Sequence, residues 1–343
     1  MPSSDTPPET AVGQDSSSPQ PNDEVLRYFE QNPGDDTGGV SDIGLLRAQT
    51  HDVGLRVRGA LQPIGMSTDL VVHGVRVRRY TPENLTNPRL GFIWIHGGGW
   101  MHGDLEVYDG VARAFANQLG CEVVAVDYAL APEHPFPAGL DDVWNVVLWA
   151  EQEFEDIVVA GDSSGGTLAA AASIKARDNG IRIAAQLLIY PVLESSDETS
   201  FKQGFRTRFA SFAGQENFGE STYQRIKWIW DVYAPDPALR QSPLATPMRA
   251  ESLADVAPAV ILTAEHDILR GEAEAYAARL RADGVRVELI EFAGQIHGFL
   301  QMRGVLTDAQ TALEVASDAL RRCLAPEPAR TAPIHPASKT KES

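Results

Sequence analysis

The chain has 343 residues, of which 47 are acidic and 29 basic, and its formal net charge is -18. A surface of that sign repels nucleic acids and anionic membranes, so we expect neither as a partner. Hydrophobic residues make up 43% of the chain, but the longest apolar runs are only a few residues long. This hydrophobic content suits a packed core. The apolar runs are far shorter than the roughly 20 residues that span a bilayer.

Both ends of the chain lack side chains that could be buried. Residues 1–23 are rich in Ser, Pro, Asp and Gln, and residues 325–343 are rich in Pro and then in Lys, so we predict a disordered tail at each end. The first tail has no Lys or Arg and no apolar run of a secretory signal. The two cysteines, Cys121 and Cys323, show no disulfide or metal-type spacing. These features predict a cytoplasmic protein.

Between the tails, residues 24–324 are predicted to form one α/β domain. Short β-branched runs predict strands at 69–72, 75–80, 91–95, 122–126, 157–160, 186–190, 259–263 and 285–292. Amphipathic segments predict helices at 107–118, 138–153, 165–178 and 271–283. This order predicts a mainly parallel sheet with helices on both faces. The first two strands are separated only by His73-Gly74 and are therefore predicted to form an antiparallel hairpin at one edge.

Two stretches do not follow this order, and both are predicted to be cap pieces. Residues 24–60 contain helix-like pieces before the first strand, and residues 195–250 separate two strands by far more than an ordinary crossover. The second stretch is rich in Phe, Tyr and Trp, which predicts a lid over an apolar pocket. The alternative is a small satellite core packed on the main domain, which is compatible with a lid.

The predicted strand at 157–160 runs directly into Gly161-Asp162-Ser163-Ser164-Gly165-Gly166, which a predicted helix follows. A nucleophile elbow requires a strand, a very tight turn and a helix. It also requires glycines two residues before and after the serine, because side chains there would collide with neighbouring elements. The pattern predicts that Ser163 is the nucleophile of a serine hydrolase. The alternative is a Gly/Ser-rich turn without chemistry.

A second glycine-rich turn, His96-Gly97-Gly98-Gly99-Trp100, also ends a predicted strand. Successive glycines let backbone N–H groups come close to a substrate oxygen, as an oxyanion hole requires. We predict that the N–H groups of Gly98, Gly99 and Ser164 form this hole, and that His96 braces the turn rather than acting as a base. The rival, a phosphate-binding loop, is disfavoured because the Lys and Ser/Thr of the P-loop pattern are missing.

A serine hydroxyl needs a base to take its proton, and in a hydrolase of this kind the chain order is Ser, acid and then His. Downstream of Ser163 lie His266, His297 and His335. His335 falls in the predicted tail, and His266 is next to Asp267 and so is poorly placed to be oriented by it. His297 follows the last predicted strand and a turn, which puts it at the carboxyl edge of the sheet. We predict His297 as the base; the alternative is a structural histidine.

The acid that orients the base is predicted to be Asp267, because it follows the strand at 259–263 by a short loop and so reaches the same edge. Glu265 is the first alternative and Glu291 the second. Asp267 also stands where it can cap the following helix, a role that is compatible with orienting His297.

The segments His96-Gly97-Gly98-Gly99-Trp100, Gly161-Asp162-Ser163-Ser164-Gly165-Gly166 and Ala131-Pro132-Glu133-His134-Pro135-Phe136-Pro137-Ala138 resemble motifs of the bacterial hormone-sensitive-lipase family of esterases. Asp267-Ile268-Leu269 and His297-Gly298-Phe299 resemble its acid and base motifs in the same order. The resemblance covers residues 60–322. It implies an α/β-hydrolase fold with a helical cap, and hydrolysis of short- to medium-chain acyl esters without a cofactor or metal; a homodimer is compatible with it. It also implies a triad and oxyanion donors, namely Ser163, Asp267 and His297 with Gly98, Gly99 and Ser164.

Three positions depart from the family pattern. Ala129 stands where the family usually has Arg, Ser164 where it usually has Ala, and Arg270-Gly271-Glu272 where an acidic pair is common. None of them belongs to the predicted triad, but together they suggest a side branch of the family.

The predicted function is a carboxylesterase-like serine hydrolase that acts on a small-molecule ester. Trp100 and Asp162 are expected in a substrate pocket for an apolar acyl or alcohol group of modest size. An amidase, a carbamate hydrolase or a lactonase would use the same residues, because these enzymes differ in the leaving group and the pocket shape. A ligand-binding receptor on this fold is a further alternative, although the presence of His297 argues against it.

Overall fold

The computed structural model describes residues 20–33, 35, 40–196, 199–208, 211–212, 215–216 and 218–325. The predicted tails lie outside these residues except for 20–23 and 325. Helix α1 (Asp23–Gln31) begins inside the first predicted tail, because the side chain of Asn22 caps it by accepting the backbone N–H of Val25 at 3.0 Å. The backbone N–H of Asn22 also donates to the carbonyl of Gly294 at 3.0 Å, which attaches the start of α1 to the sheet.

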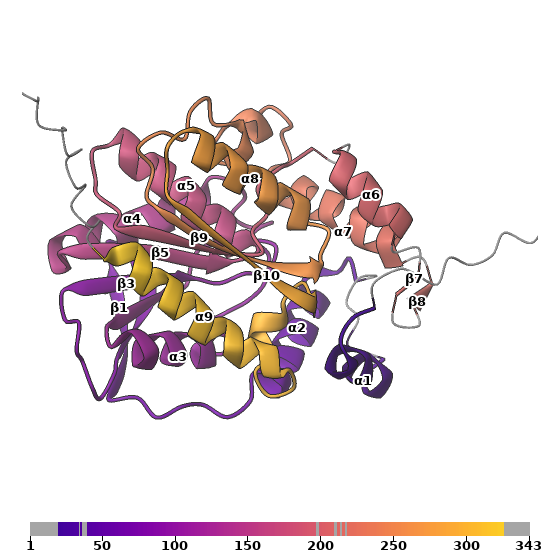
Figure 1. The fold of residues 1–343 in the computed structure, drawn as a ribbon, viewed down its shortest axis with the longest axis horizontal. Helices are drawn as coiled ribbons and strands as arrows, with labels where there is room; N and C mark the ends of the chain where they lie inside the picture. Colours follow the sequence, from indigo (N-terminus) through magenta and orange to yellow (C-terminus); the bar gives the residue numbers. More distant parts are fainter. Residues whose placement is uncertain are drawn as a thin grey trace, which may run out of the picture.

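An eight-stranded sheet runs through the middle of the molecule in the order β1-β2-β4-β3-β5-β6-β9-β10 (Figure 1). Its strands are β1 (Met66–Val72), β2 (Val75–Thr81), β3 (Leu90–Ile95), β4 (Glu122–Val126), β5 (Asp156–Asp162), β6 (Ala185–Ile189), β9 (Ala259–His266) and β10 (Val287–Ile296). Each overlaps a predicted strand. The mainly parallel sheet is confirmed, since among these strands the antiparallel pairings are those of β2 with β1 and with β4. The edge hairpin is confirmed as well, with Val72 paired to Val75 across His73-Gly74.

Helices cover both faces of the sheet, as the apolar strands predict. Figure 1 shows α3 (Asp109–Leu119) and α9 (Thr307–Leu324) on one face, and α4 (Ala138–Glu153), α5 (Ser164–Asp178) and α8 (Arg270–Ala282) on the other. All residues of β3, β4 and β6 are buried. The core therefore lies in the two layers between sheet and helices, where apolar surface is removed from water on both sides of the strands.

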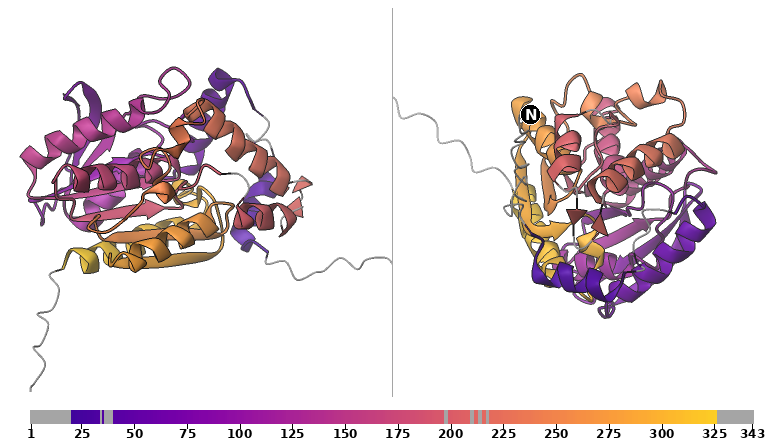
Figure 2. Two further views of the ribbon diagram at one scale, coloured as in Figure 1. Left: turned by 90° about the horizontal axis from the view of Figure 1, so that it is seen from above. Right: turned by 90° about the vertical axis from the view of Figure 1, so that its right-hand side faces the viewer.

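Four more helices gather beyond the carboxyl ends of the parallel strands: α1, α2 (Ile43–Val57), α6 (Ser200–Arg208) and α7 (Phe218–Tyr233) (Figures 1 and 2). They come from the two stretches expected to form the cap. The short strands β7 (Ser211–Phe212) and β8 (Gln215–Glu216) and the single-turn helices η1 (Leu239–Gln241), η2 (Pro247–Arg249) and η3 (Phe299–Gln301) complete the described elements. Among the described helices, none is both long and apolar enough to cross a membrane.

Candidate active site

Ser163 stands on the tight turn between β5 and α5. Its backbone has φ 52° and ψ -119°, a strained conformation for a residue with a side chain. The turn is held by the N–H of Ser163, which donates to the carbonyl of Ile189 at 2.8 Å. The flanking glycines leave the space it needs: a Cβ on Gly161 would lie 2.4 Å from the backbone of Gly165, and one on Gly165 2.1 Å from the carbonyl oxygen of Ile95. This is the geometry of a nucleophile elbow.

Three side chains that follow three strand ends form one hydrogen-bonded chain. His297, after β10, places Nε2 2.9 Å from Oγ of Ser163 and Nδ1 2.8 Å from Oδ2 of Asp267. Asp267, after β9, has a fully buried side chain whose Oδ1 accepts the backbone N–H of Leu269 at 2.9 Å. Because β5, β9 and β10 are parallel and end at one edge of the sheet, Ser163 and His297 meet although they are 134 positions apart.

Two opposing effects act on the pKa of His297. Partial burial lowers it, because the imidazolium loses water. The charge of Asp267, its hydrogen bond with Nδ1 and the charges of Asp162 and Glu272 raise it and together outweigh burial, so the pKa lies above its ordinary value. With the Nδ1 proton directed at Asp267, Nε2 is left as the acceptor for the serine hydroxyl.

The rival acids and bases have other surroundings in the structure. Glu265 accepts a backbone N–H from β10 at 2.9 Å, and Glu291 pairs with Arg270 at 2.5 Å. The side chain of His266 is fully buried, and its Nε2 lies 3.9 Å from Oε2 of Glu265. His335 lies outside the described residues. Among these candidates, Asp267 and His297 are the ones that the structure brings to Ser163.

The second glycine turn follows β3 and lines the same cavity as Ser163. Among the described residues, the backbone N–H groups of Gly98, Gly99 and Ser164 have no hydrogen-bond acceptor, so they can bind a substrate oxygen. Gly98 and Gly99 line the cavity that contains Ser163. Ser164 is tied to the same turn, since its Oγ accepts the N–H of Trp100 at 3.1 Å, and it begins α5, whose amino terminus favours a nearby negative charge.

Replacing Gly98 with alanine is expected to lower kcat for ester hydrolysis on the order of 100-fold, because the backbone N–H that is predicted to bind the oxyanion is displaced. Gly98 has φ 119°, and a Cβ there would lie 2.0 Å from the carbonyl oxygen of His102, so the turn must shift. Steady-state kinetics with p-nitrophenyl acetate measures the loss. Gly180→Ala is the control, since Gly180 also has a positive φ, 71°, but no atom lies within 4 Å of its Cβ position. Equal losses in the two variants would contradict the role of Gly98.

His96 braces the glycine turn, as its place in the motif predicts. Its ring is buried, its Nδ1 lies 2.8 Å from the carbonyl oxygen of Gly97, and it stacks on Tyr128 with ring centroids 4.4 Å apart. The hydroxyl of Tyr128 donates to the carbonyl of His96 at 2.9 Å. Burial lowers the pKa of His96, which keeps the ring neutral at ordinary pH.

Trp100 does not line the cavity that contains Ser163, which corrects its expected place in the substrate pocket. Its side chain is 1% exposed and stacks on Tyr233 of α7, with ring centroids 3.8 Å apart. Trp230 of the same helix lies at 5.0 Å. The ring of Trp100 therefore packs against α7 and does not face the cavity.

Asp162 is also absent from the cavity wall, a second correction, because its carboxylate is fully buried and ties the two turns together. It accepts hydrogen bonds from the N–H of Gly97 at 2.7 Å, the hydroxyl of Tyr108 at 3.0 Å and Nε2 of Gln301 at 3.3 Å. Burial raises the pKa of Asp162 to about 6, although these bonds favour its ionised form. Tyr108 and Gln301 belong to no motif, and no signal in the sequence could have placed them here.

A cavity of about 440 Å³ opens in front of Ser163, and apolar side chains from α1, α6 and α7 form much of its wall: Phe29, Phe205, Phe218, Ile226, Ile229 and Trp230. A second cavity, of about 350 Å³, adjoins it at His297 and has a more polar lining, which includes Arg47, His51, His102 and Asp104. The sequence identified the aromatic stretch but not which of its residues face the cavity. Within the described part of the chain, no group of His, Cys, Asp and Glu side chains could hold a metal ion.

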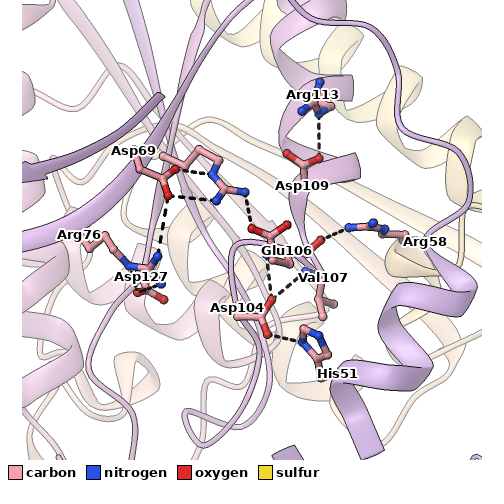
Figure 3. Close-up of polar contacts among 11 residues, drawn as sticks. His51, Arg58, Asp69, Arg76, Asp104, Glu106, Val107, Asp109, Arg113 and Asp127 are labelled. Carbon is pink, nitrogen blue, oxygen red and sulfur yellow. Dashed lines mark hydrogen bonds and ion pairs between the residues drawn. The ribbon is translucent and has the colours of Figure 1, made fainter. Parts of the chain in front are cut away.

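The loop after the glycine turn is held by contacts from helix α2 and from strand β2 (Figure 3). Asp104 lies 2.7 Å from Nδ1 of His51 in α2 and accepts two backbone N–H groups of its own loop. The carboxylate of Glu106 pairs with Arg78 of β2 at 2.8 Å, and Arg78 also pairs with Asp69 of β1. These contacts anchor the chain between the glycine turn and α3 to the edge of the sheet and to α2.

Known proteins are similar to this chain over most of its length. A family model described as the alpha/beta hydrolase fold matches residues 92–301, which include Ser163, Asp267 and His297. The chain is 33% identical over 253 residues to an arylesterase of Saccharolobus solfataricus, which covers 69% of this chain and 78% of that relative. It is 35% identical over 263 residues to carboxylesterase NlhH of Mycobacterium tuberculosis, with coverages of 73% and 79%.

A solved structure extends the similarity to three dimensions. The Pyrobaculum calidifontis esterase in its monoclinic form matches with a TM-score of 0.76 and 30% identity, over 88% of this chain and 98% of the esterase chain. The chain therefore belongs to the alpha/beta hydrolase fold family. Its resemblance to the hormone-sensitive-lipase-like esterases is confirmed.

Proposed function

We propose that the protein hydrolyses carboxylic esters with small to medium acyl or alcohol groups through an acyl-enzyme on Ser163. The observation that carries this proposal is the unbroken hydrogen-bonded chain from Ser163 through His297 to Asp267 beside an apolar cavity. The names of the relatives support an ester as the substrate: arylesterase, carboxylesterase and, at 31% identity over 264 residues, an ethyl acetate hydrolase of Pseudomonas putida.

The reaction proceeds in two acyl-transfer steps. Nε2 of His297 takes the proton of Ser163 as Oγ attacks the ester carbonyl carbon, and the backbone N–H groups of the glycine turn and of Ser164 stabilise the oxyanion. The imidazolium, oriented by Asp267, protonates the leaving alcohol as its C–O bond breaks, and the acyl group remains on Oγ. A water molecule then attacks the acyl carbon while His297 takes its proton. Return of that proton to Oγ releases the carboxylic acid and restores the enzyme.

A substrate panel tests the proposal. We expect turnover of p-nitrophenyl esters with a preference for short and medium acyl chains, because the apolar cavity of about 440 Å³ has room for groups of that size. Amides should react more slowly, since an amine is a poorer leaving group than an alcohol. If a matched carbamate or lactone is hydrolysed faster than the ester, that class of compound is the substrate instead. The same residues would catalyse its hydrolysis.

A non-catalytic receptor on this fold is the alternative from another class of protein. A fluorophosphonate probe separates the two, because it reacts with a serine that a neighbouring base activates. We expect stoichiometric labelling at Ser163 and loss of esterase activity in parallel. A wild-type chain that stays unlabelled would favour the receptor.

We also propose a homodimer, which the family resemblance suggests, and a cytoplasmic location, which the cysteine content suggests. Light scattering on the purified protein tests the first: a mass of 37.2 kDa, that of one chain, would contradict it. Fractionation of the source cells tests the second.

A further inference from the structure

A buried ion pair joins α6, beyond the carboxyl edge of the sheet, to α8 of the hydrolase core. The side chains of Lys202 and Glu272 are 1% and 0% exposed, and Nζ lies 3.4 Å from Oε1. Two buried charges lose their hydration, and such a pair generally stabilises a fold no more than well-packed apolar side chains of the same size would. Stability alone therefore does not explain why these two residues are charged.

Both side chains also hold the segment that leads from β6 into α6. The ammonium of Lys202 donates to the carbonyls of Glu194 at 2.7 Å and Ser196 at 3.0 Å. Oε2 of Glu272 accepts the backbone N–H of Leu193 at 2.8 Å and also that of Glu194. The segment is thus held from two sides. The carboxylate of Glu272 in the core binds its N–H groups, and the ammonium of Lys202 on α6 binds its carbonyl groups.

We call this segment, residues 192–196, the connecting strap. It joins the surroundings of Ser163 to the wall of the cavity. Its first residue, Val192, lines the cavity and donates its backbone N–H to the carbonyl of Ser163 at 3.2 Å. Beyond the strap, Phe205 follows Lys202 by about one helical turn on α6 and lines the same cavity. The position of Lys202 therefore affects both the approach to Ser163 and the place of one aromatic wall residue.

The contact between α6 and α8 is close at this point, so the pair has little freedom to adopt another arrangement. A Cβ on Gly271, the residue before Glu272, would lie 2.5 Å from the side chain of Phe201, the residue before Lys202. Burial raises the pKa of Glu272 to about 7, although Lys202 and the two N–H bonds lower it. Loss of the ammonium would thus leave a buried carboxyl without its counter-charge.

We propose that Lys202 and Glu272 are a positioning pair that holds α6 and Phe205 against the cavity and so determines how tightly the enzyme binds acyl chains that reach this wall. The proposal rests on the proposed ester hydrolysis at Ser163. Neither residue touches the reacting atoms. An acetyl group, with a single methyl, makes far less contact with the wall than a hexanoyl group does, so acetate ester hydrolysis is the internal reference.

The test compares Lys202→Met, which keeps an unbranched apolar side chain of similar length, with the wild type and with Lys175→Met. Lys175 also forms an ion pair at 3.4 Å, with Asp141, but its side chain and that of its partner are 22% and 57% exposed. In Lys202→Met we expect KM for p-nitrophenyl hexanoate to rise about tenfold, as when roughly two methylene groups lose their contact. KM and kcat for the acetate should stay within about twofold. Lys175→Met should change neither ester.

A second readout does not depend on activity. Hydrogen exchange followed by mass spectrometry is expected to show faster exchange of the α6 amides in Lys202→Met than in the wild type, because the helix loses an anchor to the core. The proposal would be overturned if KM rose by the same factor for the acetate and the hexanoate. It would also be overturned if a folded Lys202→Met variant kept the wild-type KM for hexanoate and the wild-type exchange rates of α6. A wild type that hydrolyses neither ester would contradict the proposed function instead, and the exchange rates of α6 would still decide the role of the pair.

If Lys202→Met does not fold, the double variant Lys202→Met/Glu272→Leu carries the test, because it buries no unpaired charge. A raised KM for hexanoate with an unchanged KM for acetate in this variant supports the pair as a positioning device. A wild-type KM for hexanoate would overturn it, since an apolar contact would then position α6 equally well.

Discussion

Ser163→Ala is expected to abolish ester hydrolysis, with kcat lower by on the order of 10⁵- to 10⁶-fold and the fold unchanged. The substitution removes the oxygen that lies 2.9 Å from Nε2 of His297, and a water molecule is then the remaining nucleophile. The hydrogen bonds that hold the elbow use the backbone of Ser163, so they survive the change. The midpoint of thermal unfolding should therefore stay close to that of the wild type.

The measurement is the rate of p-nitrophenyl acetate hydrolysis at high enzyme concentration, with circular dichroism to check the fold. Ser173→Ala is the matched control: Ser173 is a buried serine of α5, the helix that follows Ser163, and its Oγ accepts the N–H of Ala257 at 3.3 Å outside the cavity. We expect this control to keep the wild-type kcat. Undiminished turnover by Ser163→Ala would remove the basis of the proposed mechanism.

Asp267→Asn is expected to lower kcat/KM on the order of 10³- to 10⁴-fold at neutral pH. The two carboxylate oxygens accept hydrogen bonds from Nδ1 of His297 at 2.8 Å and from the N–H of Leu269 at 2.9 Å. An amide can keep an oxygen on one of these donors but must turn its NH₂ group to the other. If the NH₂ group faces His297, it donates to Nδ1, and the imidazole then carries its proton on Nε2. A protonated Nε2 cannot accept the proton of Ser163. The imidazolium of the transition state also loses its counter-charge.

The same substitution is expected to move the acid limb of the pH–rate profile to lower pH. His297 acts as a base only when neutral, so wild-type kcat/KM falls as the pH drops through its pKa. In the wild type, burial lowers this pKa, but Asp267, helped by Asp162 and Glu272, raises it by more, so that it lies above the ordinary value. Without the carboxylate the effect of burial remains, so the pKa falls and the residual activity persists to lower pH. Profiles of kcat/KM between about pH 5 and 9 test this.

Glu265→Gln is the control for this experiment, because Glu265 is the nearest rival for the acid. Its carboxylate accepts the backbone N–H of Gly294 at 2.9 Å, a bond that a glutamine oxygen can also accept. The acid limb of this variant should match that of the wild type. If the acid limb shifts in Glu265→Gln but not in Asp267→Asn, then Glu265, and not Asp267, orients His297.

Local features of this protein could be predicted from the sequence because they depend on neighbours in the chain. The elbow is the clearest case: glycines at 161 and 165 flank a serine between an apolar run and a helix, and the backbone there can turn in few ways. Strand β10 shows the limit. A turn was expected at Ala293-Gly294-Gln295, but the strand continues to Ile296 through a shift in register and pairs with His266 of β9.

The choice between Asp267 and Glu265 depended on the tertiary structure. Both residues stand at the correct edge of the sheet, and the path of the backbone after β9 decides which of them faces His297. Trp100 was expected in the pocket, but its ring stacks on Tyr233 of α7, a distant helix, and does not line the cavity.

The sequence by itself determined the elbow and the parallel sheet, because glycine positions and apolar periodicity reflect forces between residues close in the chain. The tertiary structure alone decided which side chains line the cavity, that Tyr108 and Gln301 hold Asp162, and that Lys202 meets Glu272. These contacts join residues from separate elements, and no local pattern encodes them. They exist because the fold brings those elements together and because burial favours hydrogen bonds between the polar groups that meet there.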